Sequence, residues 1–239
     1  MPDAIMVLAG WLGLTAASAL LCVVACKGRV KWGLLLSALA LMAVYDALLT
    51  RGYGHIPISF WPSNWKWEGK TLAVLLSLTI ASLPMIGWQR AGLTLKQDRR
   101  GLTGALILSG VLVVLFLGLA LYFPTPPLDV DELAFQLTMP GLDEELFYRG
   151  VLLLMFNEAF GRPIRLLGAQ MGWGALITSV AFGLTHALGY AEGAFSFDAM
   201  AMALTGAPAL LLVRIREKTG SVLLPIVLHN FANSIFHLV

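Results

Sequence analysis

The sequence predicts an all-α, polytopic membrane protein of about eight transmembrane helices. Hydrophobic residues make up 58% of the 239 residues and charged residues only 13%, whereas ordinary soluble domains are about a quarter charged. Apolar stretches almost free of charge recur along the whole chain, and many approach the roughly 20 residues that a helix needs to cross a bilayer. Basic residues also gather on every second connector, as in a chain that crosses the membrane repeatedly.

The eight expected helices follow the apolar stretches. The first has no basic residue before it and a basic cluster after it, so it fits a membrane span better than a cleaved signal peptide. The seventh is short and contains Pro208, which predicts a tilted, kinked or partly re-entrant segment. The expected spans are 4–26, 32–50, 70–88, 102–123, 140–158, 169–189, 199–213 and 221–238.

The charges on the connectors predict the orientation. Twelve of the 16 basic residues lie after the first, third, fifth and seventh spans, and the positive-inside rule makes that side cytoplasmic. Both termini then lie outside, and we expect the membrane to be the bacterial inner membrane. The tryptophan-rich connector HIPISFWPSNWKWEGK fits the outer interface. The twelve residues are Lys27, Arg29, Lys31, Arg90, Lys96, Arg99, Arg100, Arg162, Arg165, Arg214, Arg216 and Lys218.

The stretch GLDEELFYRG, residues 141–150, places charges at the start of the fifth span. Ionisable residues inside a membrane are costly and are therefore functional candidates. Glu145 and Arg149 are four residues apart, so they share a helix face and are expected to form an ion pair. Glu144 points about 100° away around the helix, and we expect it to lack a charged partner.

Two further spans carry polar groups at a compatible depth. His186 lies near the outer end of the sixth span, and His229 and Asn233 share one face of the eighth. The predicted topology places Glu144 and His186 in the outer halves of their spans. It places His229 near mid-depth and Asn233 one turn further out. A carboxylate and an imidazole can bind a water and take its proton, while a histidine and an asparagine can donate hydrogen bonds to an oxyanion. This set therefore indicates hydrolysis of a peptide bond.

At these residues the chain resembles the CPBP family, which includes type II CAAX prenyl proteases, bacteriocin-processing proteins and Abi-like proteins. EELFYR matches the EExxxR motif of that family, FGLTH matches FxxxH through Phe182 and His186, and HNFAN matches HxxxN. The motifs occur in the family's order on separate spans. The resemblance covers residues 140–239, so we divide the chain into N-terminal transmembrane helices of unclear role, 1–125, and a CPBP-like catalytic core, 126–239.

The resemblance implies a role for each motif residue. Members of the family are described as glutamate-dependent intramembrane proteases with an eight-helix fold. Carried over, Glu144 with His186 would activate water, and His229 with Asn233 would form the oxyanion site. Three residues would be supporting: Glu145, Arg149 and Phe182.

Two other functions stay open. A metal-dependent membrane protease could use two histidines and a carboxylate as ligands, but the HExxH spacing is absent, and we expect neither a metal nor a cofactor. A non-catalytic membrane immunity or scaffold protein is the alternative from a different class. The GxSxG elbow of serine hydrolases is also absent.

The expected partners are a peptide or protein substrate and the lipid bilayer, with no nucleic acid. Because the predicted site opens to the outer face, we rank a C-terminal anchor or leader of an exported protein first. A maturing peptide comes second. A prenylated tail comes third, since such tails are made in the cytosol.

Overall fold

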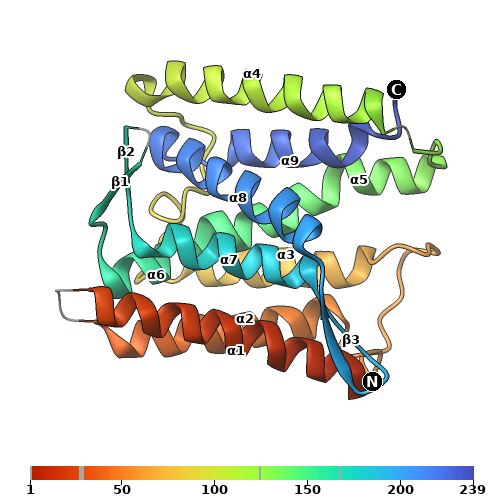
Figure 1. Ribbon diagram of the computed structural model, residues 1–239, viewed down its shortest axis with the longest axis horizontal. Coiled ribbons are helices and arrows are strands. Elements are labelled where there is room, and N and C mark those ends of the chain that lie inside the picture. The colour runs from red at the N-terminus through yellow and green to blue at the C-terminus, as the bar shows by residue number, and fades with distance from the viewer. Residues whose placement is uncertain (1, 27–29, 124, 167) are drawn as a thin grey trace. The chain divides into compact units, whose positions relative to one another are not determined.

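Helices are the main regular structure of the protein, and the strands are few and short (Figure 1). The computed structural model describes residues 2–26, 30–123, 125–166 and 168–239. Because α5, η1 and α6 follow one another without a break, these residues contain eight helical runs, which confirms the all-α class. The helices are α1 (Pro2–Ala25), α2 (Trp32–Leu49), α3 (Trp67–Ser82), α4 (Arg99–Tyr122), α5 (Val130–Glu144), the π-helix η1 (Glu145–Leu152), α6 (Leu153–Phe160), α7 (Trp173–Ala187), α8 (Ala199–Thr219) and α9 (Leu223–Ile235).

Four of the described helices are long and apolar enough to cross a membrane: Asp3–Ala25, Trp32–Leu49, Arg99–Tyr122 and Ala199–Thr219. In the first three, only 22% of the most apolar window is buried inside the protein. Helices that expose apolar side chains on most of their surface need lipid around them. The chain is therefore a polytopic membrane protein, as its composition predicts.

Three helix boundaries differ most from the prediction. The fifth helical run begins at Val130 instead of residue 140, because Asp129 caps it by accepting a hydrogen bond from the backbone N–H of Glu132 and the helix continues through Pro140. Helix α3 ends at Ser82 instead of residue 88, since Leu83 is extended before a proline. Helix α8 is continuous through Pro208 and extends to Thr219.

Two short antiparallel hairpins were not predicted. They pair β1 (Ile164–Leu166) with β2 (Ala169–Met171), and β3 (Leu188–Ala191) with β4 (Ala194–Phe197). Glu192 and Gly193 connect β3 to β4, and both have positive φ angles, 52° and 80°. This is the backbone geometry of a tight hairpin turn.

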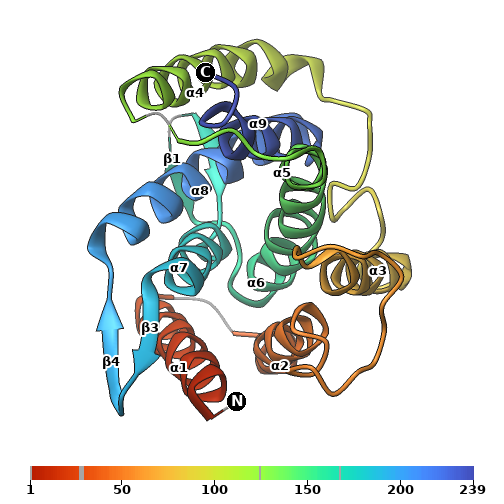
Figure 2. The same cartoon turned by 90° about the vertical axis from the view of Figure 1, so that its right-hand side faces the viewer.

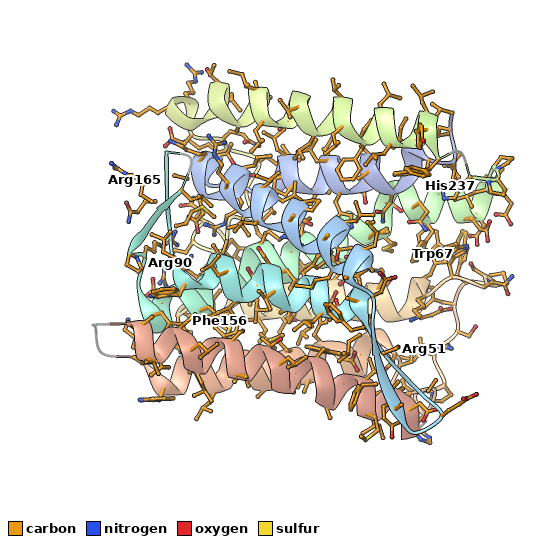
Figure 3. All side chains as sticks on the ribbon, viewed as in Figure 1. Arg51, Trp67, Arg90, Phe156, Arg165 and His237 are labelled. Carbon is orange, nitrogen blue, oxygen red and sulfur yellow. The ribbon has the colours of Figure 1, made fainter. Side chains whose placement is uncertain are left out.

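The chain forms two compact units, each assembled from separate segments. The first unit contains Met1–Ile56 and Leu152–Arg214. In it α1 packs against α7, and α6 packs against both α2 and α7. Phe156 of α6 is fully buried in this unit (Figure 3).

The second unit contains Pro57–Val151 and Ile215–Val239. Helix α9 packs against α5 and α4, and α3 packs against α5; Figure 2 shows α4, α9 and α5 as neighbours. Lys27 and Arg29, two of the basic residues used to orient the chain, lie outside the described residues.

The side chain of Asn230 links α9 to α5 by hydrogen bonds on both sides of Pro140. Its side-chain oxygen accepts a hydrogen bond from the N–H of Gly141 at 2.7 Å, and its nitrogen donates to the carbonyl of Thr138 at 3.1 Å. A Cβ on Gly141 would lie 2.6 Å from the carbonyl oxygen of Ile226. The two backbones therefore approach closely just before the acidic stretch.

Candidate active site

The acidic stretch begins where the α-helix becomes a π-helix. Helix α5 ends at Glu144, and η1 begins at Glu145 and continues to Leu152. Every residue of η1 is buried. Wider π-turns are rare, and they occur often at functional sites because they re-aim the side chains that a regular helix would place. The sequence spacing alone did not predict this change.

Glu145 lies at the centre of the cluster. Its Oε1 is 3.0 Å from Nη1 of Arg149, so the predicted ion pair is present, and it is also 2.7 Å from Nδ1 of His229. The side chains of Glu145 and Arg149 are 0% and 2% exposed. A buried carboxylate is stable only with such partners, so Glu145 connects η1 to α9.

The expectation that Glu144 lacks a charged partner was wrong. The Nζ of Lys70, from α3, lies 2.5 Å from Oε1 of Glu144 and 3.0 Å from Oδ2 of Asp143. No local pattern links residues more than 70 positions apart; the contact exists because α3 packs against α5. Lys70 lies at the start of an apolar helix. A charged residue at that position was the one feature of the sequence that could have indicated Lys70 as a partner of a buried carboxylate.

His229 lies close to both glutamates. Its Nδ1 binds Glu145, and its Nε2 is 3.6 Å from Oε2 of Glu144. An ionised carboxylate only accepts hydrogen bonds, so Nδ1 carries a proton whenever Glu145 is ionised. The second nitrogen then faces Glu144 either as an acceptor or, in the imidazolium, as a donor.

Asn233 lies one turn beyond His229 on α9. Its Nδ2 donates a hydrogen bond to Oε1 of Gln136, on α5, at 3.3 Å. Gln136 had no place in the sequence prediction, because one polar residue in a helix carries no signal of its own. The second unit therefore brings together Glu144, Glu145 and His229, with Asn233 on the same helix.

His186 belongs to the first unit and lies in the last turn of α7 (Trp173–Ala187). Its Nδ1 lies 2.8 Å from the carbonyl oxygen of Phe182, and its ring centroid is 4.7 Å from that of Phe182. The FxxxH spacing thus joins the two residues across one helical turn. With Nδ1–H donating to a carbonyl, Nε2 is left as an acceptor that can take a proton.

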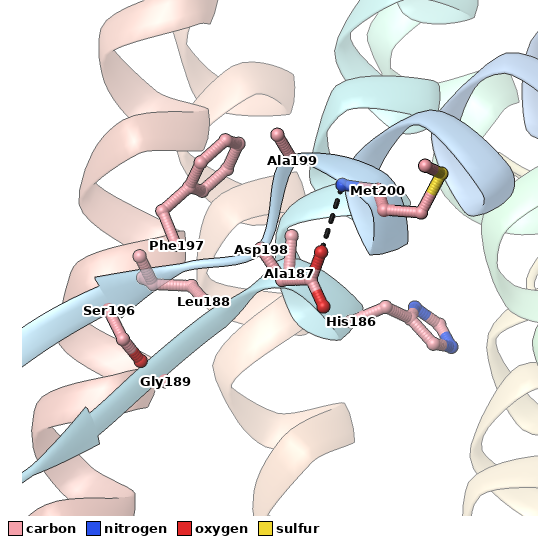
Figure 4. A pocket seen from close by; sticks show the side chains of 9 residues that line it. All are labelled: His186, Ala187, Leu188, Gly189, Ser196, Phe197, Asp198, Ala199 and Met200. Atoms are coloured by element: carbon pink, nitrogen blue, oxygen red, sulfur yellow. Dashed lines mark hydrogen bonds between the residues drawn. The ribbon is translucent and has the colours of Figure 1, made fainter.

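The surroundings of His186 form an open cavity of about 740 Å³. Figure 4 shows the imidazole projecting from the end of α7, and the same cavity is lined by Asp198, just before α8, and by Met200 in the first turn of α8. The two helices approach closely, because a Cβ on Gly183 would lie 2.5 Å from Sδ of Met202. His186 is exposed and stands beside space that could admit a ligand.

The described part of the chain contains no group of three or more His, Cys, Asp or Glu side chains placed to hold one metal ion. A metal-dependent reaction is therefore tested by measuring the activity before and after treatment with a chelator.

Comparison with known proteins covers the C-terminal part of the chain. Residues 126–235 match the family model of type II CAAX prenyl endopeptidase Rce1-like proteins. The matched segment contains the EExxxR, FxxxH and HxxxN motifs, whereas Lys70 lies outside it. No curated protein and no solved structure matches the chain. The division of the chain at residue 125 stays a prediction, since both compact units combine segments from its two sides. Through residues 126–235, this polytopic membrane protein is similar to the Rce1-like type II CAAX prenyl endopeptidases.

Proposed function

We propose that the protein is an intramembrane endopeptidase in which Glu144 activates a water molecule to attack a peptide bond. The observation that carries the proposal is the buried cluster in which Glu144 lies beside His229 and the Glu145–Arg149 pair. The family match covers the residues of that cluster apart from Lys70. Ionisable groups are kept within a membrane helix bundle mainly where chemistry or transport requires them.

The reaction needs no nucleophilic side chain. Glu144 takes a proton from the water, the water oxygen bonds to the carbonyl carbon, and the carbonyl becomes an oxyanion. The proton then passes to the leaving nitrogen as the peptide bond breaks, which restores the carboxylate. The FxxxH motif of the family implies that His186 also takes part in the activation of water.

His229 and Asn233 are the proposed oxyanion donors. The amide of Asn233 can donate in any state. His229 can donate from Nε2 only as an imidazolium, because its Nδ1 proton is directed to Glu145. The oxyanion role thus depends on Glu145, which makes Glu145 a supporting residue with a defined task.

The proposed substrate is the C-terminal anchor or leader of an exported protein, ahead of a maturing peptide and a prenylated tail. The proposal rests on the charge distribution, which puts both termini outside and opens the site to the outer face of a bacterial inner membrane. Reactivity of C-terminal tags tests this orientation. Labelling by an impermeant reagent from outside intact cells supports it, and labelling from the cytoplasmic side alone reverses it.

The experiment for the activity uses the purified full-length protein in liposomes and a set of peptides with hydrophobic tails. We expect cleavage by the wild type and a rate about 10²–10⁴-fold lower for Glu144→Gln, the usual loss when a general base is removed. The two proteins must have equal thermal stability for the comparison to hold. If Glu144→Gln keeps full cellular function and cleaves every peptide at the wild-type rate, the non-catalytic immunity or scaffold function is favoured.

A further inference from the structure

Lys70 is a buried cation that lies outside the matched family segment. Its side chain is 8% exposed, and its Nζ binds Glu144 at 2.5 Å and Asp143 at 3.0 Å. The mechanism above does not use it. Removing an ammonium group from water is costly, and two carboxylates at contact distance offset that cost. Asp143, which is fully buried, already provides a partner within the protein. Asp143 alone can therefore neutralise the charge of Lys70, and the contact with Glu144 goes beyond neutralisation.

Hydrogen bonds from the preceding connector hold the first turn of α3, which carries Lys70, in position. Oε1 of Glu68 accepts hydrogen bonds from the backbone N–H groups of Phe60 and Trp61, at 3.1 and 3.2 Å. Oδ1 of Asp131, at the start of α5, accepts from the indole nitrogens of Trp61 and Trp67, at 2.8 and 3.2 Å. The connector before α3 thus ties the start of α3 to the start of α5 (Trp67 is labelled in Figure 3).

The contact also determines which way Glu144 faces. Its Oε1 is bound to Lys70, and its Oε2 is 3.6 Å from Nε2 of His229. A glutamate has several rotatable bonds, and a general base must keep its oxygen within a few tenths of an ångström of the productive place. An ammonium on one oxygen restricts the carboxylate and leaves the other oxygen directed to the histidine.

We infer that Lys70 is a positioning residue of the active site, which holds the Glu144 carboxylate in its reactive orientation. The inference rests on the proposed role of Glu144 as general base. It extends the functional site beyond residues 126–235 and gives α3 a task in the reaction. A positioning residue acts on turnover, because it stabilises the arrangement in which water loses its proton and attacks the peptide carbonyl, and it has little effect on the binding of the peptide.

The test compares four variants of the full-length protein on the peptide that the wild type cleaves. Lys70→Met removes the charge and keeps the length, and Lys70→Arg keeps the charge with a planar head. Lys66→Met removes an exposed lysine one turn earlier as the control, and Glu144→Gln reports on the proposed function. We expect kcat to fall about tenfold or more in Lys70→Met, with KM within about twofold of the wild type. Lys70→Arg should be intermediate, and Lys66→Met unchanged.

The outcomes separate the inference from the proposed function. A Lys70→Met variant with wild-type kcat, alongside an inactive Glu144→Gln, overturns the inference and leaves the function standing. An active Glu144→Gln overturns the function itself. If Lys70→Met does not fold, Lys70→Arg decides: a lysine that only neutralises charge predicts wild-type kcat for the arginine variant, and a positioning lysine predicts a lower kcat with unchanged KM.

Discussion

His229 donates a hydrogen bond from Nδ1 to Oε1 of Glu145 over 2.7 Å, and this contact joins α9 to the π-helix η1. The same glutamate oxygen is 3.0 Å from Arg149. Glu145 therefore determines both the tautomer of a candidate catalytic histidine and the stability of a buried arginine. Neighbouring Glu144 has a different set of partners, so the two glutamates should respond differently to substitution.

The first prediction compares Glu144→Gln with Glu145→Gln. Glutamine keeps the shape of each side chain but cannot accept a proton from water. Glu144→Gln should lose turnover and keep its fold. Glu145→Gln should lower the free energy of unfolding by about 3–5 kcal/mol, the usual effect of removing one partner of a buried ion pair.

Thermal unfolding in detergent and steady-state kinetics check this difference. The midpoint of Glu145→Gln should fall while that of Glu144→Gln stays near the wild type. Identical behaviour of the two variants in both measurements would show that our division of roles between the glutamates is wrong.

The second prediction concerns His229→Ala and Asn233→Ala. If both side chains donate to the oxyanion, each variant should lose about 10²–10³-fold in kcat and keep KM, because the interaction is made only in the transition state. The kinetics are measured with and without a chelator and with added Zn²⁺. Elemental analysis of the wild type provides the control: one equivalent of bound metal that disappears in His229→Ala would establish a metalloprotease instead.

The third prediction is structural and concerns Asn230. This residue bonds the backbone on both sides of Pro140, at Thr138 and Gly141. Asn230→Ala should lower the free energy of unfolding by about 1–3 kcal/mol, because a buried N–H and a carbonyl lose their partner. Asn230→Asp keeps the acceptor for Gly141 but not the donor to Thr138, so this variant should lose less stability than Asn230→Ala.

The measurement for Asn230 is the thermal midpoint in detergent, with Gly141→Ala beside it. A methyl group on Gly141 would meet the Ile226 carbonyl at 2.6 Å, so this variant should also be destabilised. Wild-type stability in both variants would mean that α5 and α9 do not approach as closely as described.

The fourth prediction is a pH dependence at the start of α5, outside the membrane-spanning segments. Hydrogen bonds from Ser63 and Trp61 lower the pKa of Asp131 below its ordinary 3.8. A carboxyl with a lowered pKa in the folded state stabilises the protein above its unfolded pKa, and this contribution is lost as the pH falls through the folded value. The wild type should therefore exceed Asp131→Asn in thermal midpoint above about pH 4 and converge with it at lower pH.

Thermal unfolding between about pH 3 and 7 checks this, with Ser63→Ala as the matched control. Removing the Ser63 hydroxyl deletes the largest cause of the lowered pKa, so the pH-dependent difference should shrink. A constant difference between wild type and Asp131→Asn across the whole range would contradict the prediction.

The sequence by itself determined the features that depend on residue spacing within one helix and on the bilayer around it. Apolar length predicted most helices, because the bilayer sets the length that a span needs. The spacing of four residues predicted the Glu145–Arg149 pair and placed His229 and Asn233 on one face of α9, since such residues are neighbours on any helix. The three motifs also indicated the family whose model matches residues 126–235.

The early start of α5 was missed for a physical reason. The segment from Val130 to Thr138 is too polar to read as a membrane span, and proline usually ends a helix. Here the Asp129 cap starts the helix, and Asn230 supports the backbone around Pro140 from a distant segment. Hydropathy does not detect either interaction.

Only the tertiary structure decided the partners of the charged groups. Lys70 meets Glu144 and His229 meets Glu145 because α3 and α9 both pack against α5 and its continuation. These pairs are separated by 74 and 84 positions in the chain, so no local periodicity relates them. The cost of an unpaired charge in a membrane tells us that each buried charge must have a partner, but helix packing selects which residue that partner is.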